Sequence, residues 1–176
     1  AFRSPFLGRS RFIAQTEALL DDAAGGAGRI LLLSGEAGIG KTRALEQLVS
    51  LADARGFRVL QGRCFESEGA PAFWPWIQML RAGIEADASR SLLRTLVESA
   101  PEVAWMVPEL RPLAPDVPQM GSLEAQTARF MLFDAVTRFL DGLAADRPHL
   151  LCIDDLHRAD TASLALLLHI ARELAR

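Results

Sequence analysis

The stretch LLLSGEAGIGKTRALEQL, from Leu31 to Leu48, decides the fold of this 176-residue chain. Its residues Gly35 to Thr42 match the pattern G-x-x-x-x-G-K followed by serine or threonine, which forms a loop around phosphate groups. The apolar run in front of the loop predicts a strand over 29–34 that is buried on both faces, as in a parallel sheet. Apolar residues at helical spacing behind the loop predict a helix that begins at Lys41.

Lys41 is the only lysine among the 19 lysines and arginines of the chain, and its position has a chemical reason. A compact, flexible ammonium group reaches between the β- and γ-phosphates of a nucleotide, whereas a planar guanidinium prefers a fixed two-pronged geometry. Glycines let backbone N–H groups turn toward the phosphates, and Thr42 offers a hydroxyl to Mg²⁺. The candidate nucleotide-binding residues are Gly35, Glu36, Ala37, Gly38, Ile39, Gly40, Lys41, Thr42 and Arg43.

A pair of acidic residues ends a second apolar run, HLLCIDD, which predicts a buried strand from His149 to Asp155. Neighbouring side chains near a strand end point in different directions, so Asp154 and Asp155 can serve separate roles. We assign Asp154, together with Thr42, to the metal ion, and Asp155, together with Lys41, to catalysis, with Asp155 polarising the attacking water. A polar turn after a strand is the alternative interpretation of the pair. Because Asp155 reaches less far than a glutamate, its presence argues against fast hydrolysis.

The rest of the chain alternates between helical and extended patterns, which indicates a βαβ unit and a parallel sheet. We expect helices over 9–24, 76–86 and 90–99, a strand over 57–64, and turns with short helices over 101–121. Ser122 is expected to cap a long helix with Glu124 in its first turn, and Asp160 to cap the last helix. The aromatic cluster around Trp76 is expected to pack over the strand 57–64, with a partner surface as the alternative.

Composition and charge exclude several classes of protein. The net charge of -3 and the pI of about 5.6 argue against nonspecific nucleic-acid binding by this segment. No apolar run reaches the roughly 18 residues that span a bilayer, and the first residues carry no secretory signal. Cys64 and Cys152 lie far apart in apolar surroundings, so we expect two buried thiols in a reducing, cytoplasmic setting.

Four segments together resemble the STAND branch of AAA-like P-loop ATPases, in particular the ATPase module of large LuxR-type (MalT-like) transcriptional regulators. The segments are PFLGRSRFIAQ, LLLSGEAGIGKTRALEQL, GRCFESEGAPAFWPWIQML and LLCIDDLHRADTASLALL. The first has Ser10 where that family usually has an acidic residue, and the last has Arg158 where tryptophan is usual. The resemblance implies that Leu7, Gly8 and Arg9 lie near the adenine of a bound nucleotide.

The resemblance also implies the fold class, which is α/β: a P-loop NTPase (ASCE/AAA-like) with three αβα layers and a parallel sheet in the order 5-1-4-3-2. The fourth, sensor strand lies between the first and the third, and we expect the chain to be truncated before it, which leaves two unpaired inner edges. The expected organisation is the N-terminal portion of one domain. It comprises a leading helix in 1–28, a phosphate-loop unit in 29–64, a helical insert in 65–146, and the acidic-pair strand with its following helix in 147–176.

Three functions agree with these features. The first is a regulatory switch that binds ATP with Mg²⁺ and hydrolyses it slowly to ADP, inside a larger signalling or transcriptional regulator. The second is an AAA+ motor or loader that acts on DNA or protein, and the third, less favoured, is a small-molecule kinase. Expected partners are nucleotide and other domains of the parent chain, with self-association on ATP binding. DNA is expected to be reached only through a C-terminal domain outside these residues, and no membrane is expected.

Overall fold

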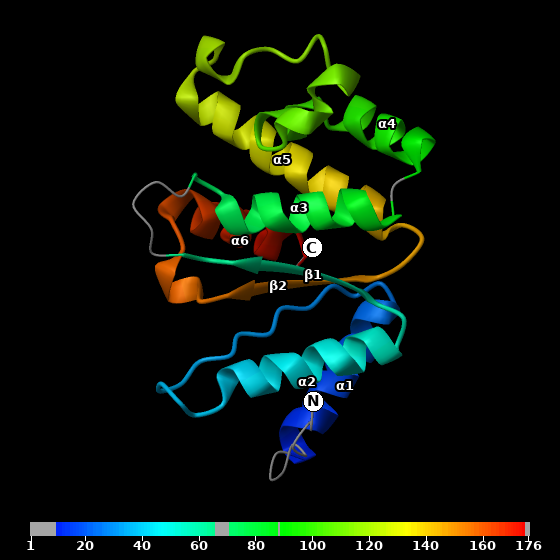
Figure 1. Ribbon diagram of the computed structural model, residues 1–176, viewed down its shortest axis with the longest axis vertical. Helices are drawn as coiled ribbons and strands as arrows, with labels where there is room; N and C mark the ends of the chain where they lie inside the picture. The colour runs from blue at the N-terminus through cyan, green and yellow to red at the C-terminus, as the bar shows by residue number, and fades with distance from the viewer. Residues whose placement is uncertain (1–9, 66–70, 88, 175–176) are drawn as a thin grey trace.

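The computed structural model describes residues 10–65, 71–87 and 89–174, in which helices surround a short sheet (Figure 1). The α-helices are α1 (Ser10–Ala24), α2 (Lys41–Ala54), α3 (Trp74–Asp87), α4 (Arg90–Ser99), α5 (Ala125–Ala144) and α6 (Thr161–Glu173). The strands are β1 (Arg58–Arg63) and β2 (His149–Asp154), and the 3-10 helices are η1 (Pro101–Trp105), η2 (Pro108–Leu113), η3 (Met120–Ser122) and η4 (Leu156–Arg158). The predicted start of a helix at Lys41 is confirmed.

The two strands run parallel, with Arg58 opposite His149 and Arg63 opposite Asp154. Their apolar runs predict both strands, and β1 follows Gly56, whose φ of +83° favours glycine and ends the preceding helix. Parallel strands bring their carboxyl ends to the same edge of a sheet. Arg63 and Asp154 therefore lie side by side, although the whole helical insert separates them in the sequence.

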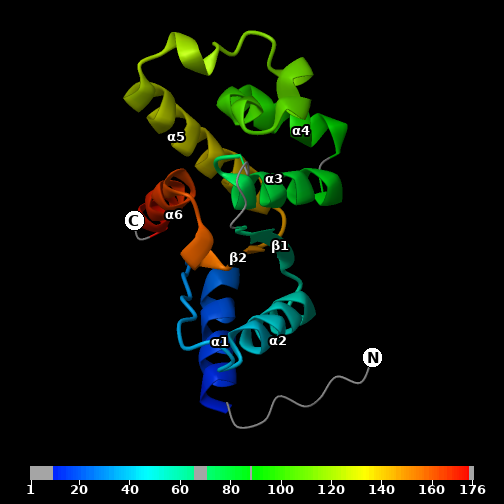
Figure 2. The same ribbon diagram turned by 60° about the vertical axis from the view of Figure 1, so that its left-hand side comes forward.

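Helices cover both faces of this sheet, which gives three αβα layers (Figures 1 and 2). Helices α3, α5 and α6 lie on one side, and α1 and α2 lie on the other. The side of α1 and α2 has a small apolar core of Leu20, Leu48, Ala52 and Phe57. The opposite side has a larger core that includes Leu60, Trp76, Phe139 and Leu166, each at most 1% exposed.

The helical insert, residues 65–146, packs its first helix directly on β1. Trp76 of α3 is buried there, as the sequence predicts for the aromatic cluster. Pro101 and Pro108 stand at the first positions of η1 and η2, where the missing backbone N–H of proline has no helical partner to lose. The prolines of this region thus divide it into short helices, which confirms the prediction for 101–121.

The predicted strand over 29–34 is wrong: this segment is extended but pairs with no strand of the described residues. Ile30 and Leu32 are 52% and 71% exposed, not buried on both faces. A strand needs hydrogen bonds from a neighbour, and β1 and β2 pair with each other instead. The resemblance places this segment between a fourth and a fifth strand, neither of which the described residues contain.

The two predicted helix caps have different outcomes. Asp160 caps α6, because its side chain accepts a hydrogen bond from the Ser163 backbone N–H at 2.9 Å. The prediction for Ser122 is wrong, since Ser122 ends η3 and its hydroxyl donates to the Gln119 carbonyl at 2.7 Å. The N-cap of α5 is Glu124, which makes no side-chain capping bond. Because Ser122 belongs to η3, it lies two residues before the N-cap position of α5.

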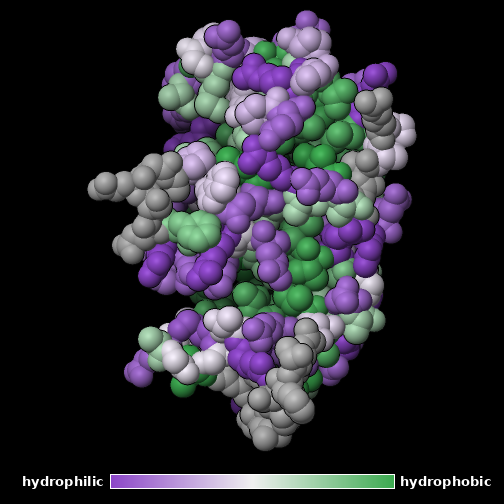
Figure 3. Space-filling model, in the orientation of Figure 1, coloured by the Kyte–Doolittle hydropathy of each residue, from purple (hydrophilic) through white to green (hydrophobic). Residues whose placement is uncertain are grey.

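Apolar residues gather on the face of the molecule shown in Figure 3, over α4 and between the strands and α2. The second of these areas follows from the small sheet, because two strands leave the layer of α1 and α2 only partly covered. Val59 and Leu150 remain partly exposed there, although they pack against the smaller core. In the ranges that the structure describes, no helix combines the length and the apolar character needed to cross a membrane.

Candidate functional site

The loop before α2 turns on two glycines with positive φ, Gly38 at +78° and Gly40 at +93°. Side chains with a Cβ rarely adopt this conformation, so the turn requires glycine. Gly40 is also the N-cap of α2, and no side chain caps this helix start. The first backbone N–H groups of α2 and the positive end of its dipole therefore face the loop, which is an arrangement that binds anions.

The Lys41 side chain contacts the backbone at the start of the phosphate loop. Its Nζ atom donates to the backbone carbonyls of Gly35 and Glu36, both at 2.9 Å. These partners are neutral, whereas a phosphate oxygen is charged and forms stronger hydrogen bonds with an ammonium group. The ammonium group is thus held at the phosphate loop by contacts that a nucleotide can replace.

A cavity of about 360 Å³ opens at this loop, lined by Gly38, Gly40, Lys41, Thr42, Arg43 and Glu46. Thr42 is exposed, so its hydroxyl is accessible from this cavity. A second, more apolar depression of about 210 Å³ adjoins it at Lys41 and is lined by Phe12, Leu32, Leu33, Ser34, Ile39 and Ala44. The first cavity combines backbone donors, a cation and a hydroxyl, which are the groups that bind polyphosphate.

Mg²⁺ fits the donor set that the structure brings to this end of the molecule. The described residues contain no cluster of three or more His, Cys, Asp or Glu side chains that could hold a metal by themselves. Mg²⁺ does not need such a cluster, because it keeps several waters and is bound by one or two protein oxygens plus substrate phosphates. The Thr42 hydroxyl and the Asp154 carboxylate are oxygen donors of the type that Mg²⁺ prefers.

The acidic pair lies where the chain leaves β2. Asp154 ends the strand, and its Oδ1 accepts a hydrogen bond from the Asp155 backbone N–H at 2.8 Å. Asp155 has a φ of +55° and is the N-cap of η4. This left-handed conformation turns the chain, and the two carboxylates have different partners: Asp154 accepts from a backbone N–H and Asp155 from Arg63.

Arg63 contacts the acidic pair and is a site residue that the sequence analysis missed. Its Nε and Nη2 atoms both donate to Asp155 Oδ2, at 3.1 and 3.0 Å. The guanidinium carbon also lies 5.8 Å from the centre of the Phe65 ring, within cation–π range. The sequence contains one indication of this contact, which is a charged residue at the end of the predicted strand 57–64. Parallel pairing brings that strand end to the acidic pair.

Two buried thiols lie close to the acidic residues. Burial, followed by the charges of Asp160, Asp155 and Asp154, raises the pKa of the Cys64 thiol. Burial and the charge of Asp154 raise the pKa of Cys152 to about 11. Both cysteines are free and buried, as predicted, and both stay protonated at neutral pH, which makes them poor nucleophiles and poor metal ligands.

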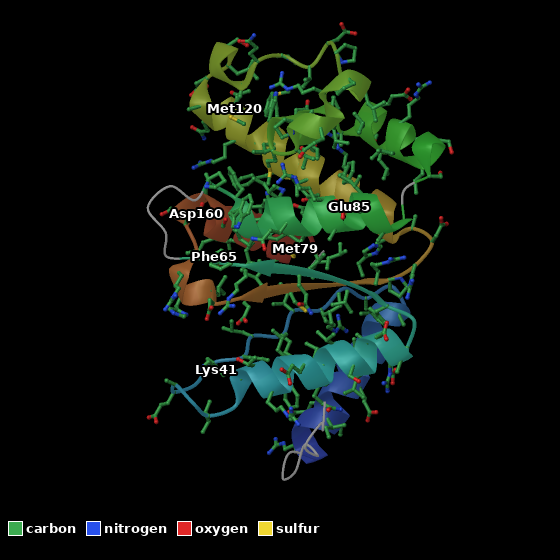
Figure 4. All side chains as sticks on the ribbon, viewed as in Figure 1. Lys41, Phe65, Met79, Glu85, Met120 and Asp160 are labelled. Atoms are coloured by element: carbon green, nitrogen blue, oxygen red, sulfur yellow. The ribbon has the colours of Figure 1, made fainter. Side chains whose placement is uncertain are left out.

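The phosphate loop and η4 lie on the same side of the molecule, on the left in Figure 1. Figure 4 shows Lys41 at the start of α2, and Phe65 and Asp160 above it at the same end. We call residues 154–160, from the end of β2 to the N-cap of α6, the acidic loop. The structure thus brings Lys41 and the acidic loop to one side of the fold. Leu7, Gly8 and Arg9, which the resemblance places near the adenine, lie outside the described residues.

Comparison with known proteins gives one family. A family model described as an AAA ATPase domain matches residues 5–176. No match to this chain was found among curated proteins or among solved structures.

Proposed function

Because this chain belongs to the AAA ATPase domain family, we propose that it is the nucleotide-dependent switch of a larger signalling or transcriptional regulator. In this proposal, binding of ATP with Mg²⁺ favours one arrangement of the parent protein, and slow hydrolysis to ADP resets it. The partners are the other domains of the parent chain and further copies of it. Contact with DNA comes only through a separate domain.

The ion pair between Arg63 and Asp155 is the observation that carries this proposal. The Asp155 oxygen that accepts two bonds from Arg63 is the group that must orient the attacking water. A carboxylate engaged in this way is a weaker hydrogen-bond acceptor for water than a free one. Bound ATP therefore stays unhydrolysed until Arg63 moves away, which is the behaviour of a switch and not of a continuously cycling motor.

Each residue of the site has a defined task in this proposal. Lys41 exchanges its two carbonyl partners for phosphate oxygens, and the N–H groups at the start of α2 hold the phosphate chain. Thr42 and Asp154 are the ligands that would hold Mg²⁺, which neutralises charge on the phosphates when it is bound. Asp155 orients the water for attack once its oxygen is released.

The energy available from nucleotide binding is sufficient for a switch. Moving a two-state equilibrium from 1:99 to 99:1 requires about 5.5 kcal/mol of differential binding. Micromolar affinity corresponds to about 8 kcal/mol in total. Nucleotide can therefore drive the switch if most of its contacts form in only one of the two states.

Turnover under saturating ATP and Mg²⁺ tests the proposal. A switch should hydrolyse well below about one ATP per second, the lower end of typical turnover numbers, while nucleotide changes the oligomeric state. Sustained turnover of many ATP per second points instead to a motor or loader, and phosphate transfer to an added acceptor points to a kinase. Failure of the chain to bind ATP would contradict all three, with the Lys41→Ala variant as the reference for absent binding.

A further inference from the structure

The N-terminal end of α3 contacts the end of β1 through Gln78. The Gln78 side chain accepts a hydrogen bond from the Arg63 backbone N–H at 3.3 Å and donates one to the Arg63 carbonyl at 3.1 Å. The next residue, Cys64, donates its N–H to Asp154 on β2, so the Arg63 backbone groups face the other edge of the strand. Gln78 thus takes the place of a neighbouring strand at Arg63, whose side chain pairs with Asp155.

The same end of α3 contacts the far end of the acidic loop through Trp76. The Trp76 indole N–H donates to the Ser163 carbonyl at 3.1 Å, in a buried contact. Ser163 in turn donates to Asp160 twice, from its backbone N–H at 2.9 Å and from its hydroxyl at 2.6 Å. Asp160 follows η4, which begins directly after Asp155. Helix α3 is therefore connected to both ends of the acidic loop, to one end by Gln78 through Arg63 and to the other by Trp76 through Ser163.

Close backbone packing makes this attachment stiff. Pro75, directly before Trp76, places its carbonyl oxygen against Gly62, where a Cβ would overlap it. A helix that lies this near to a strand backbone transmits small displacements, because packed interiors have little room to absorb them.

Left-handed backbone conformations occur at both ends of the connection. Asp155 and Phe73 are the non-glycine residues with positive φ in the described part of the chain, at +55° and +64°. Such a conformation is a genuine outlier for a bulky residue and persists only where the surroundings enforce it. Phe73 directly precedes α3, and its ring lies edge-on to Phe133 of α5, with the ring centroids 6.1 Å apart. The contact at Phe73 extends the connection from α3 into the body of the helical insert.

We propose that the N-terminal end of α3 couples the acidic pair to the rest of the helical insert, with Gln78 as the positioning residue that holds Arg63 against Asp155. Trp76 is the second anchor, through Ser163 and Asp160. This inference rests on the proposed function, because nucleotide is the ligand that separates the two states. In one state Arg63 pairs with Asp155, and in the other Asp155 is released and the strain on the connection changes.

Hydrogen–deuterium exchange on the full chain, with and without saturating ATP and Mg²⁺, tests the coupling. Wild type should change its exchange in α3 and α5 by roughly three- to tenfold, the range expected when a hydrogen-bonded contact is lost or gained. Gln78→Met keeps the length of the side chain but forms neither amide hydrogen bond. It should bind ATP within about twofold of wild type, because the phosphate loop is a separate element, yet lose the response in α5.

A matched control and a second variant keep the test decisive. Gln126→Met makes the same change on the exposed side of α5 and should respond as wild type does. If Gln78→Met does not fold, Gln78→Glu replaces it, because it keeps an acceptor for the Arg63 N–H and loses the donor. In a turnover assay, Gln78→Met should increase the rate of ATP hydrolysis when Arg63 is present. It should have no further effect on that rate in the Arg63→Met variant. If Gln78 has only a structural role, Gln78→Met changes the rate equally in both backgrounds.

The outcomes separate this inference from the proposed function. A wild-type response in the Gln78 variant, or ATP binding by wild type without any response in α3 and α5, overturns the coupling and leaves the switch intact. No ATP binding by wild type overturns the proposed function, and the coupling fails with it. Loss of the response with ATP affinity retained, and with the turnover effect dependent on Arg63, supports the coupling.

Discussion

Arg63 and Asp155, which are 92 positions apart in the sequence, form an ion pair in which both Nε and Nη2 of the arginine donate to one carboxylate oxygen. The Asp155 side chain is 27% exposed and that of Arg63 is 59% exposed, so water screens the pair only in part. The pair holds a candidate catalytic carboxylate on the same side of the fold as the phosphate loop. Its disruption is therefore the most direct way to change the chemistry without touching nucleotide binding.

Replacing Arg63 by methionine should raise the rate of ATP hydrolysis per bound nucleotide. Partly exposed ion pairs contribute about 0.2–1 kcal/mol, so we expect up to about a fivefold increase. ATP affinity should stay unchanged, and Arg129→Met, at an exposed position on α5, is the matched control. Single-turnover assays measure the rate, and an unchanged or slower rate in Arg63→Met contradicts the restraining role of the arginine.

Lys41→Ala should lose most of the affinity for ATP. Hydrogen bonds to charged groups contribute about 1.5–3 kcal/mol, which corresponds to a loss of roughly ten- to a hundredfold. Lys41→Arg keeps the positive charge but not the compact shape, and it should not restore binding. Calorimetric titration measures the affinity, and equal ATP binding by wild type and Lys41→Ala counts decisively against the site.

Asp155→Asn should bind ATP as tightly as wild type but hydrolyse it about a hundredfold more slowly, or not at all. The amide is close in shape to the carboxylate but is a poor base and a poorer acceptor for the attacking water. Rapid filtration for bound nucleotide, combined with analysis of the bound ATP and ADP, separates the two properties. If this variant hydrolyses ATP at the wild-type rate, Asp155 serves only the turn after β2 and not catalysis.

Gly62→Ala should destabilise the fold, because the added Cβ overlaps the Pro75 carbonyl oxygen and a backbone atom cannot move aside easily. Overpacking of this kind costs about 1–3 kcal/mol of the free energy of unfolding. The same substitution at Gly121, where a Cβ meets nothing within 4 Å, is the control and should stay within about 0.5 kcal/mol of wild type. Urea denaturation measures both, and equal stabilities would show that α3 can shift on β1.

The contribution of Asp160 to stability should disappear in acid. Burial by itself raises the pKa of Asp160, but hydrogen bonds from the Ser163 hydroxyl and N–H and from the Phe73 N–H outweigh it and lower the pKa. Because the folded-state pKa lies below the ordinary value of 3.8, the stabilisation is complete above that value and is lost as the pH falls through the folded-state pKa. Asp160→Ala should thus cost about 1 kcal/mol at neutral pH and less in acid.

Denaturation of wild type and Asp160→Ala at neutral pH and near pH 3 measures this difference. Asp160→Asn is the matched variant, because asparagine caps helices nearly as well but does not titrate. A difference between wild type and Asp160→Ala that stays constant over this range would show that the charge of Asp160 is irrelevant to the cap.

The local features of the site follow from the sequence because they depend on neighbouring residues. The glycines at Gly38 and Gly40 turn the loop, and the helix begins at Lys41 where the sequence predicts it. The apolar run of β2 ends at Asp154 for the same reason, since residue order alone places the acidic pair at its carboxyl end.

Tertiary structure decided the features that depend on residues far apart in the chain. The apolar segment 29–34 has the local pattern of a strand, yet it pairs with no strand among the residues that the structure describes, because a strand forms only beside a neighbour. The register of β1 and β2 brought Arg63 to Asp155, and the packing of α3 brought Gln78 to Arg63. Local propensity selects a residue's conformation, but hydrogen bonds and ion pairs between distant segments exist only once the fold has set their positions.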